Sequence, residues 1–290
     1  TAYEIMSSDW RSDVCSSDLG RRPLTFLVDG APLAPAAARR ELGWLPPGPG
    51  FYRIAIMAAE GALVVMVDKD EAKLANAVAA INGSIAAHGG AAEAMPADAL
   101  DEAQVNGLIA DVARRHGRID ILVNAVGGST IIADPAATTE KLSFQDWQAL
   151  LHFNLTGTFL FTHAVLPVMQ RQKAGKIVNL ASIAGRGLSE ASSSAYAAAK
   201  GGIAAFTKKL AMEQGQHGIN VNAIAPATTL TERIGPRWHQ KPPEEREADI
   251  NRTPLRRMGL ASDQAKVLCF LASSDADFVT GLTIDVTGGI

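Results

Sequence analysis

The sequence predicts an α/β protein in which a doubly wound parallel sheet carries helices on both faces. From residue 52 to residue 286, apolar runs of strand length alternate with stretches of helical periodicity. Several of these runs, such as residues 62–67 and 177–181, are almost continuously apolar, which is typical of strands buried on both faces of a parallel sheet. We therefore expect residues 21–290 to form a single domain.

Composition argues against several other classes of protein. Hydrophobic residues make up 47% of the 290 residues, enough for a sizeable core, and the net charge of −3 gives no sign of attraction to nucleic acid or a membrane surface. No run of 18 apolar, uncharged residues occurs, so no membrane span is expected. The two cysteines, Cys15 and Cys269, are far apart, and the six histidines lack ligand spacing. We therefore expect a reducing, cytoplasmic location and no metal.

The first half of the alternating pattern of helices and strands covers residues 52–123. The pattern predicts helices over 52–60, 71–85 and 101–116, and strands over 62–67, 91–97 and 119–123. Each predicted strand is followed by a predicted helix, as parallel pairing requires.

The second half begins with a helix-start signal, because Ser143 is followed three residues later by Asp146. The pattern predicts a helix from there towards residue 170, strands over 177–181, 219–224 and 282–286, and helices over 196–214 and 262–273. Residues 232–258 are charged and contain prolines, and loops of this length are usually functional or mobile; by its position in the chain we interpret 228–258 as the substrate lid.

Tyr196 and Lys200 form the pair around which we expect the site to be organised. They are four residues apart on a predicted helix, so both side chains project from one face. A free tyrosine has a pKa near ~10, and a cation a few Å away can lower a pKa by roughly 1–3. Such a pair predicts an acid/base group that works near neutrality.

Ser182 adds specificity to this pair, because it lies fourteen residues before Tyr196 at the end of the predicted strand 177–181. Ligands of open α/β sheets bind at that edge. With this spacing, residues 48–290 resemble the short-chain dehydrogenase/reductase family, which implies a Rossmann fold and hydride transfer with a nicotinamide cofactor. The resemblance implies Tyr196 as general acid/base, Lys200 as its activator and a ribose ligand, and Ser182 as the donor to the substrate oxygen. Asn154 matches the family residue that holds a water in the proton relay.

Cofactor-binding positions come from spacing and from the resemblance. Asp68 ends a predicted strand twenty residues after Gly48, where an acid binds the adenine ribose 2′-hydroxyl, so NAD is favoured over NADP although Lys69 follows. The resemblance further implies binding roles for Tyr196 and Lys200 and for Asp98, Asn124, Gly127, Pro226, Thr229 and Thr231. It places Asp98 at the adenine amino group, Thr229 at the nicotinamide amide through its backbone, and Thr231 there through its hydroxyl.

The first fifty residues depart from the family pattern. The phosphate-binding turn falls on residues 43–50, where only Gly48 and Gly50 match, and Pro46, Pro47 and Pro49 offer no N–H. Residues 1–20 contain a repeated Ser-Ser-Asp and no apolar periodicity, so we interpret them as non-native or disordered. Residues 24–28 are the one apolar run before Gly50 suited to the first, central strand of the sheet.

The main hypothesis is an oxidoreductase that transfers a hydride between NAD(H) and a secondary alcohol or ketone. The resemblance also implies a homotetramer or homodimer. A second hypothesis is a 3-oxoacyl thioester reductase using NADPH, which residues 221–226 and the end of the chain also resemble, although Asp68 opposes NADP. A third is a non-catalytic binding or scaffold protein that keeps the fold. The altered turn favours this third hypothesis, whereas Asn154, Ser182, Tyr196 and Lys200 oppose it.

Overall fold

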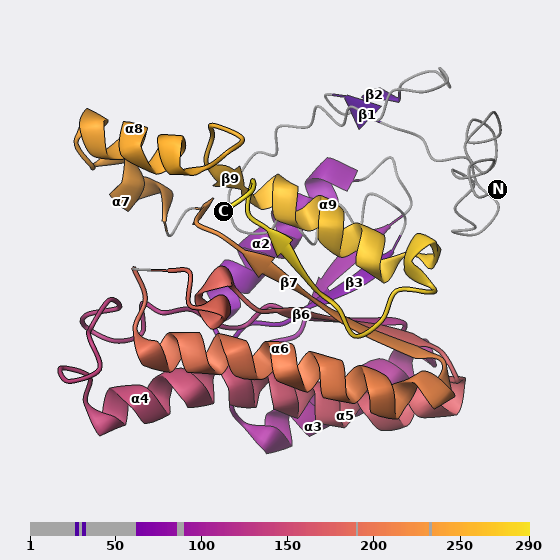
Figure 1. Ribbon diagram of the computed structural model, residues 1–290. Helices are drawn as coiled ribbons and strands as arrows, with labels where there is room; N and C mark the ends of the chain where they lie inside the picture. The colour runs from indigo at the N-terminus through magenta and orange to yellow at the C-terminus, as the bar shows by residue number, and fades with distance from the viewer. Residues whose placement is uncertain (1–26, 29–30, 33–61, 86–89, 190, 232–233) are drawn as a thin grey trace, which may run out of the picture.

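A parallel sheet with helices on both faces makes up most of the described chain (Figure 1). The computed structural model describes residues 27–28, 31–32, 62–85, 90–189, 191–231 and 234–290. Four strands, β10 (Thr283–Val286), β7 (Ile219–Pro226), β6 (Gly175–Leu180) and β5 (Ile121–Asn124), pair in that order and are all parallel. Parallel pairing brings the carboxyl ends of these strands to one edge.

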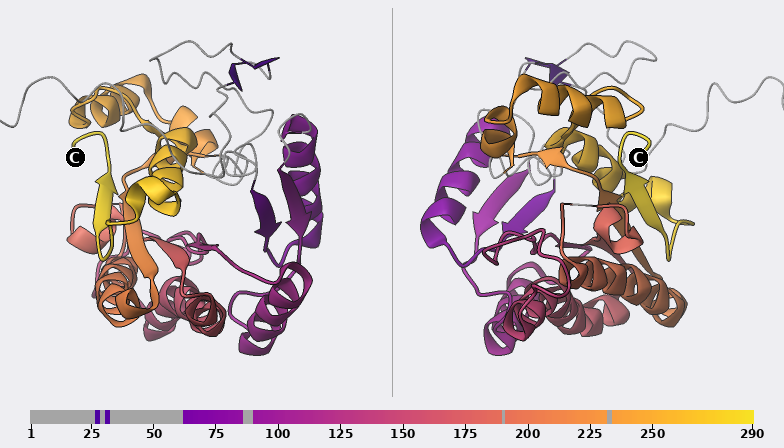
Figure 2. Two further views of the ribbon diagram at one scale, coloured as in Figure 1. Left: turned by 90° about the vertical axis from the view of Figure 1, so that its right-hand side faces the viewer. Right: turned by 60° about the vertical axis from the view of Figure 1, so that its left-hand side comes forward.

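A separate parallel pair, β3 (Leu63–Met66) and β4 (Ala91–Ala94), stands beside this sheet. Figure 2 shows the indigo pair at one end and yellow β10 at the other. The helix α2 (Glu71–Ile85) covers the pair and buries Leu74, Ala77 and Ile81 against Met66. The strand prediction for 62–67 and the helix prediction for 71–85 are confirmed, whereas the strand predicted over 91–97 ends at Ala94.

Helices cover the sheet on both faces and thereby confirm the predicted doubly wound fold. On one face α3 (Glu102–His116), α5 (Gly157–Gln172) and α6 (Ser194–Gln214) enclose a core that includes Val105, Val165 and Leu210. On the other face α9 (Ala261–Ala272) packs on β6, β7 and β10 through Leu268 and Leu271. Short 3₁₀ turns complete the description: η2 (Ile183–Arg186), η3 (Gly215–His217) and η4 (Ser274–Ala276).

The prediction for the first strand is wrong for the residues that the structure describes. Leu27 and Val28 form β1 (Leu27–Val28), which pairs antiparallel with β2 (Ala31–Pro32) and with neither β3 nor β5. An Asp-Gly pair between two short strands favours a local two-residue hairpin, which competes with pairing in a distant sheet. Other predictions fall outside the described residues: the non-native segment 1–20, the start of the strand at 24–26, the phosphate-binding turn at 43–50 and the helix over 52–60.

The helix that begins after Ser143 is interrupted once. Ser143 Oγ accepts from Asp146 N at 3.0 Å, which confirms the predicted cap, and α4 (Phe144–Leu151) leads through a π-helical turn, η1 (His152–Thr156), into α5. The segment Phe144–Gln172 is long and apolar enough to cross a membrane, but 44% of its most apolar stretch is buried inside the structure. It packs on α3, α6 and the sheet, as the core helix of a globular domain does.

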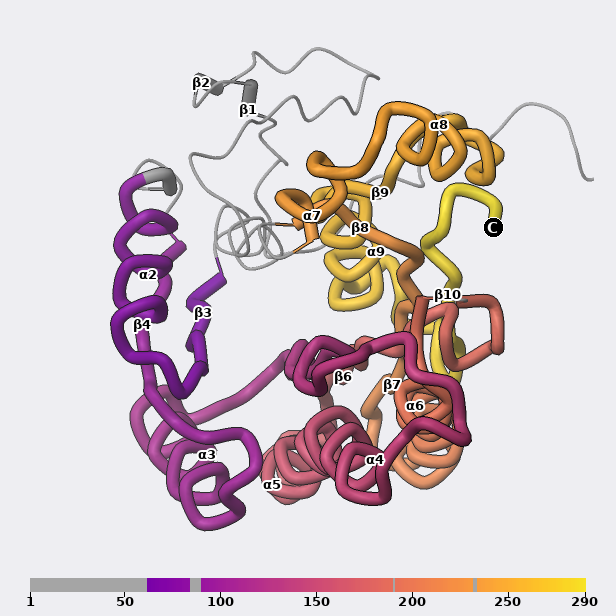
Figure 3. The backbone as a smooth tube through the Cα atoms, turned by 90° about the vertical axis from the view of Figure 1, so that its left-hand side faces the viewer, coloured from indigo at the N-terminus to yellow at the C-terminus, as the bar shows by residue number. Residues whose placement is uncertain are grey.

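The segment interpreted as a substrate-covering loop contains regular structure. Strand β8 (Thr229–Leu230) leads into two helices, α7 (Gly235–His239) and α8 (Pro243–Arg252), before β9 (Gly259–Leu260) returns to pair with β8. Figure 3 shows α7 and α8 leaving β8 and returning to β9 beside α9. The two ends of this segment are therefore joined to each other.

Candidate active site

The Tyr196–Lys200 pair lies on the first two turns of α6. Ser193 caps this helix, and its Oγ accepts from Tyr196 N at 3.4 Å. Lys200 is only 3% exposed, its Nζ donates to Leu180 O at 2.7 Å, and Nζ lies 5.8 Å from the centroid of the half-buried Tyr196 ring. A buried ammonium needs such partners, and this one lies against the end of β6.

Ser182 lies two residues beyond Leu180 and caps the turn η2, where its Oγ accepts from Ala184 N at 3.2 Å. This bond leaves the hydroxyl proton of Ser182 to be donated. The turn packs directly on α6, because a Cβ on Gly185 would lie 2.5 Å from the backbone nitrogen of Gly201. A glycine is therefore required here, and its contact fixes Ser182 relative to the start of α6.

Asn154 lies in the π-helical turn and is completely buried. Its Nδ2 donates to Leu150 O at 2.9 Å and to Gly128 O at 3.1 Å, and its Oδ1 accepts from Gly128 N at 2.9 Å. The side chain thus binds Leu150 O, just before the π-helical turn begins, and holds the loop after β5 through both backbone polar groups of Gly128. Such π turns are frequent at functional sites.

Gly127 brings these groups together. Its φ is +148°, and a Cβ there would lie 2.6 Å from Asn154 Oδ1 and 3.1 Å from Lys200 Nζ. The Cα of Gly127 therefore lies close to both the side-chain amide of Asn154 and the ammonium of Lys200, and a residue with a side chain would not fit there. The structure places Gly127, Asn154, Tyr196 and Lys200 in one cluster at the carboxyl edge of the sheet, with Ser182 on the adjoining turn.

Two protein-family models match parts of the chain. Residues 52–290 match the family model described as Enoyl-(Acyl carrier protein) reductase. The chain belongs to the short-chain dehydrogenase/reductase family. A second model, described as Penicillin-Binding Protein C-terminus Family, matches the N-terminal residues 14–67, most of which lie outside the described chain.

Curated relatives of this reductase family have similar length. The (2S)-[(R)-hydroxy(phenyl)methyl]succinyl-CoA dehydrogenase subunit BbsD of Thauera aromatica is 38% identical over 80% of this chain and 88% of its own. A 3-oxoacyl-[acyl-carrier-protein] reductase of Synechocystis is 37% identical over 81% of this chain and 89% of its own. The levodione reductase of Leifsonia aquatica is 35% identical over 80% of this chain and 86% of its own. The chain is accordingly an oxidoreductase of the type that acts on CH–OH groups.

Solved structures of the family are similar over most of this chain. A putative short-chain dehydrogenase/reductase from Burkholderia xenovorans has a TM-score of 0.74 at 36% identity, over 84% of this chain and 91% of that one. A 3-oxoacyl-[acyl-carrier protein] reductase with bound NAD from Brucella melitensis has a TM-score of 0.72 at 32% identity, over 82% and 85%. The Rossmann fold expected from the sequence is therefore confirmed.

Among the residues carried over from the family, Asn124 points into the core. Its Nδ2 donates to Thr162 Oγ1 at 3.0 Å and to Asn179 Oδ1 at 2.8 Å, and Asn179 in turn donates to Thr207 Oγ1 at 2.9 Å. This buried chain of hydrogen bonds ties β5 and β6 to α5 and α6. Asn179 and Thr207 were not predicted as part of the site, although an Asn in the middle of an apolar strand was a visible signal.

Asp68 lies two residues beyond the end of β3, and Asp98 lies four residues beyond the end of β4. Asp68 is exposed, and its Oδ1 accepts from Asp70 N at 2.9 Å. Asp98 Oδ1 accepts from Leu100 N at 3.0 Å, and its Oδ2 lies 3.8 Å from Lys69 Nζ. The two acids flank one lysine, whose ammonium leans towards Asp98.

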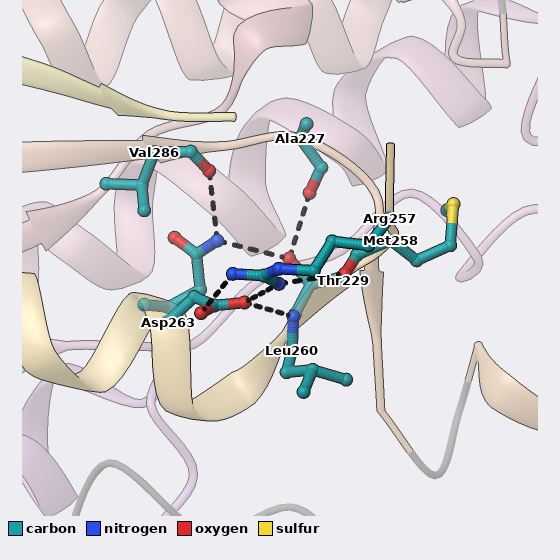
Figure 4. Close-up of polar contacts among 8 residues, drawn as sticks. Ala227, Thr229, Arg257, Met258, Leu260, Asp263 and Val286 are labelled. Atoms are coloured by element: carbon teal, nitrogen blue, oxygen red, sulfur yellow. Dashed lines mark hydrogen bonds and ion pairs between the residues drawn. The ribbon is translucent and has the colours of Figure 1, made fainter. Parts of the chain in front are cut away.

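Pro226 ends β7, and the predicted nicotinamide contacts Thr229 and Thr231 follow it. Figure 4 shows Thr229 with its hydrogen-bond partners. Thr229 Oγ1 donates to Ala227 O at 3.0 Å, so this hydroxyl is turned into the protein. Thr231 Oγ1 accepts from Ile234 N at 3.4 Å. Gly48 and Gly50 lie outside the described residues. In the described ranges no group of three or more His, Cys, Asp or Glu side chains could hold a metal ion.

An ion pair holds the end of β9 against α9. Arg257 binds Asp263 through two contacts, at 2.6 and 2.8 Å, and Asp263 Oδ2 also accepts from Leu260 N at 2.8 Å (Figure 4). The hydrogen bond from Arg257 lowers the pKa of Asp263 below its usual value, with the bond from Leu260 N adding to this and partial burial opposing it.

The pH dependence of unfolding tests this ion pair. A carboxyl with a lowered folded pKa stabilises above its unfolded pKa of ~3.9 and loses that contribution as pH falls through the folded value. We expect Asp263→Asn to lower Tm by about 2–4 °C at pH 7, the size of about 1 kcal/mol in a domain of this length. The Tm difference from the unmodified chain should close as pH falls below 3.9. A difference that stays constant down to pH 2.5 would contradict the assignment.

Proposed function

We propose that this protein catalyses the reversible oxidation of a secondary alcohol to a ketone with NAD. The observation that supports this best is the buried Lys200, bonded to Leu180 O and 5.8 Å from the Tyr196 ring centroid. A cation held beside a half-buried phenol favours the phenolate form, which can accept the hydroxyl proton of an alcohol. Bound NAD would supply the carbon that takes the hydride.

The other cluster residues support this step from fixed positions. Ser182 keeps its hydroxyl proton available, so it can donate to the substrate oxygen on which charge develops. Asn154 uses both Nδ2 protons on protein carbonyls, and a free lone pair of Oδ1 can accept from a water on the side of Gly127. Such a water would carry the proton from Tyr196 past Lys200 to solvent.

The residues present fit a dinucleotide. Gly127 brings backbone without a side chain close to Asn154 and Lys200, and Lys200 could also bind the nicotinamide ribose. Pro226 and the backbone of Thr229 and Thr231 would hold the nicotinamide end, with Asp98 at the adenine. Asp68 is exposed at the β3 end and would accept from the ribose 2′-hydroxyl. Asp68 therefore favours NAD over NADP, and the opposing charge is Lys69, whose Nζ lies 3.8 Å from Asp98 Oδ2.

Cofactor choice is the first test of the proposal. We expect the unmodified chain to prefer NAD, and Asp68→Ala to lower this preference by at least about tenfold, or ~1.4 kcal/mol, because the repulsion of a 2′-phosphate is removed. The measurement is kcat/KM with NAD and with NADP over a panel of secondary alcohols. Asp70→Ala is the matched control, since Asp70 is an acid two residues away that binds Lys73. An unmodified chain that prefers NADP would overturn the proposed role of Asp68.

Reduction of a 3-oxoacyl thioester with NADPH is the second candidate. The 37% identical relative from Synechocystis, a 3-oxoacyl-[acyl-carrier-protein] reductase, favours it, and Asp68 opposes it. Rates with acetoacetyl thioesters and NADPH, compared with those for simple ketones and NADH, separate the two reactions. A non-catalytic scaffold would turn over neither.

We further propose a homo-oligomer, a tetramer or dimer, formed through α5 and α6. Phe159 is 46% exposed on α5 and packs against His163 and Phe206 with ring centroids 5.4 and 6.4 Å apart, while Met212 on α6 is 74% exposed. An apolar face of this kind suits a second copy of the chain. The proposed setting is the cytoplasm, where thiols such as that of Cys269 stay reduced.

A further inference from the structure

Gln264 is a buried polar residue to which the proposed reaction assigns no part. It lies in the first turns of α9 and is 1% exposed. Its Nε2 donates to Val286 O, at the end of β10, at 3.0 Å and to Thr229 Oγ1, in β8, at 3.4 Å. One amide therefore joins the last strand of the sheet to the segment that follows Pro226.

The orientation of this amide follows from its partners. Nε2 must face Val286 O, because the opposite orientation would bring two oxygen acceptors together. In the described part of the chain, Gln264 Oε1 is buried without a hydrogen-bond partner. Such an oxygen is destabilising, whereas a methionine of similar volume would fill the position without it. Stability alone therefore does not account for an amide here.

The amide acts on the backbone of Thr229 through its hydroxyl. Thr229 Oγ1 accepts from Gln264 and donates to Ala227 O, so both hydrogen-bonding directions of the hydroxyl are used inside the protein. The side chain is thereby turned away from any ligand, and the backbone of β8 is held in one position. A Cβ on Gly259, in the paired strand β9, would lie 3.3 Å from Thr228 O, so the strands are in close contact here.

We propose that Gln264 is a positioning residue that holds the backbone of Thr229 in place for the nicotinamide end of the cofactor. This rests on the proposed function, in which that backbone meets the nicotinamide amide. Gln264 would affect the nicotinamide end and leave the adenosine end, at Asp68 and Asp98 on the separate strand pair, unchanged.

The test compares two ligands that share the adenosine diphosphate ribose part. NADH carries the nicotinamide, and ADP-ribose lacks it. We expect Gln264→Met to lower the ratio of NADH affinity to ADP-ribose affinity by about tenfold, as loss of a buried hydrogen bond of ordinary strength would do. Calorimetric titration of both ligands measures this ratio, and any weakness of the phosphate-binding turn cancels in it.

Gln214→Met is the matched control. Gln214 is a buried glutamine, 8% exposed, whose Oε1 accepts from Gln170 Nε2 at 2.9 Å in the last turn of α6. It should leave the ratio unchanged. A second variant, Thr229→Val, removes the acceptor, and the double variant with Gln264→Met should lose less than the sum of the two single losses, because both changes break the contact between Gln264 Nε2 and Thr229 Oγ1.

The outcomes separate the inference from the proposed function. An unchanged ratio in Gln264→Met, an equal loss for both ligands, or additive losses in the double variant would overturn the positioning role while leaving NAD-dependent turnover intact. Failure of the unmodified chain to bind either ligand would overturn the proposed function and the inference with it.

Discussion

Tyr196→Phe is expected to abolish turnover while NADH still binds. The change removes one oxygen atom and keeps the ring that lies 5.8 Å from Lys200 Nζ. General acid–base catalysis contributes about 10²–10⁴ in rate, and here the phenol oxygen is the group proposed to exchange the proton with the alcohol. Steady-state rates with the best alcohol from the panel, together with fluorescence titration of NADH, separate the chemical effect from binding.

The rate of Tyr196→Phe is compared with the rates of two other variants, one expected to be near normal and one expected to be partly impaired. Ser194→Ala deletes a hydroxyl two residues before Tyr196, where Thr139 Oγ1 binds Ser194 Oγ at 3.0 Å, and we expect near-normal rates. Ser182→Ala removes a single donor to the substrate oxygen and should lower kcat by about 10²–10³. A kcat near that of the unmodified chain in Tyr196→Phe would show that another group moves the proton.

Local signals in the sequence predicted most of the fold. The helix over 101–116 was predicted from its periodicity within one residue, and in the structure Asp101 accepts from Gln104 N at the start and Gly117 takes a left-handed conformation at the end. Both signals depend on neighbours within a few positions. The Tyr196–Lys200 spacing is equally local, and the structure places both side chains on one face of α6.

Features that depend on distant contacts could not be predicted in this way. The π-helical turn at His152–Thr156 occurs where Asn154 binds Gly128, twenty-six residues away. Gln264 matters through Thr229 and Val286, which no local pattern connects to it. The helix α8 is different, since Pro243 and the acids Glu244 and Glu245 in its first turn are ordinary helix-start signals. We interpreted residues 228–258 as a loop because of their charge and prolines, and did not use these helix-start signals.

Replacing residues 1–50 by a regular strand and a glycine-rich turn is expected to raise NADH affinity by at least about a hundredfold. In the described chain no strand pairs with β3 on one side and β5 on the other, which is where the family has its first strand. Pro46, Pro47 and Pro49 lack the N–H groups with which such a turn binds pyrophosphate. Each hydrogen bond to a charged group contributes about 1.5–3 kcal/mol, so restoring two accounts for the factor.

The same replacement should raise Tm, because the new strand would pair on both of its edges and bury apolar surface between β3 and β5. Replacing residues 1–20 alone is the control, and we expect it to change neither quantity because this stretch is proposed to be non-native. Titration of NADH and thermal unfolding of the three chains measure both effects. Equal NADH affinity and equal Tm in the unmodified and the fully replaced chain would show that the unusual N-terminal segment is a working variant of the family's first strand and turn.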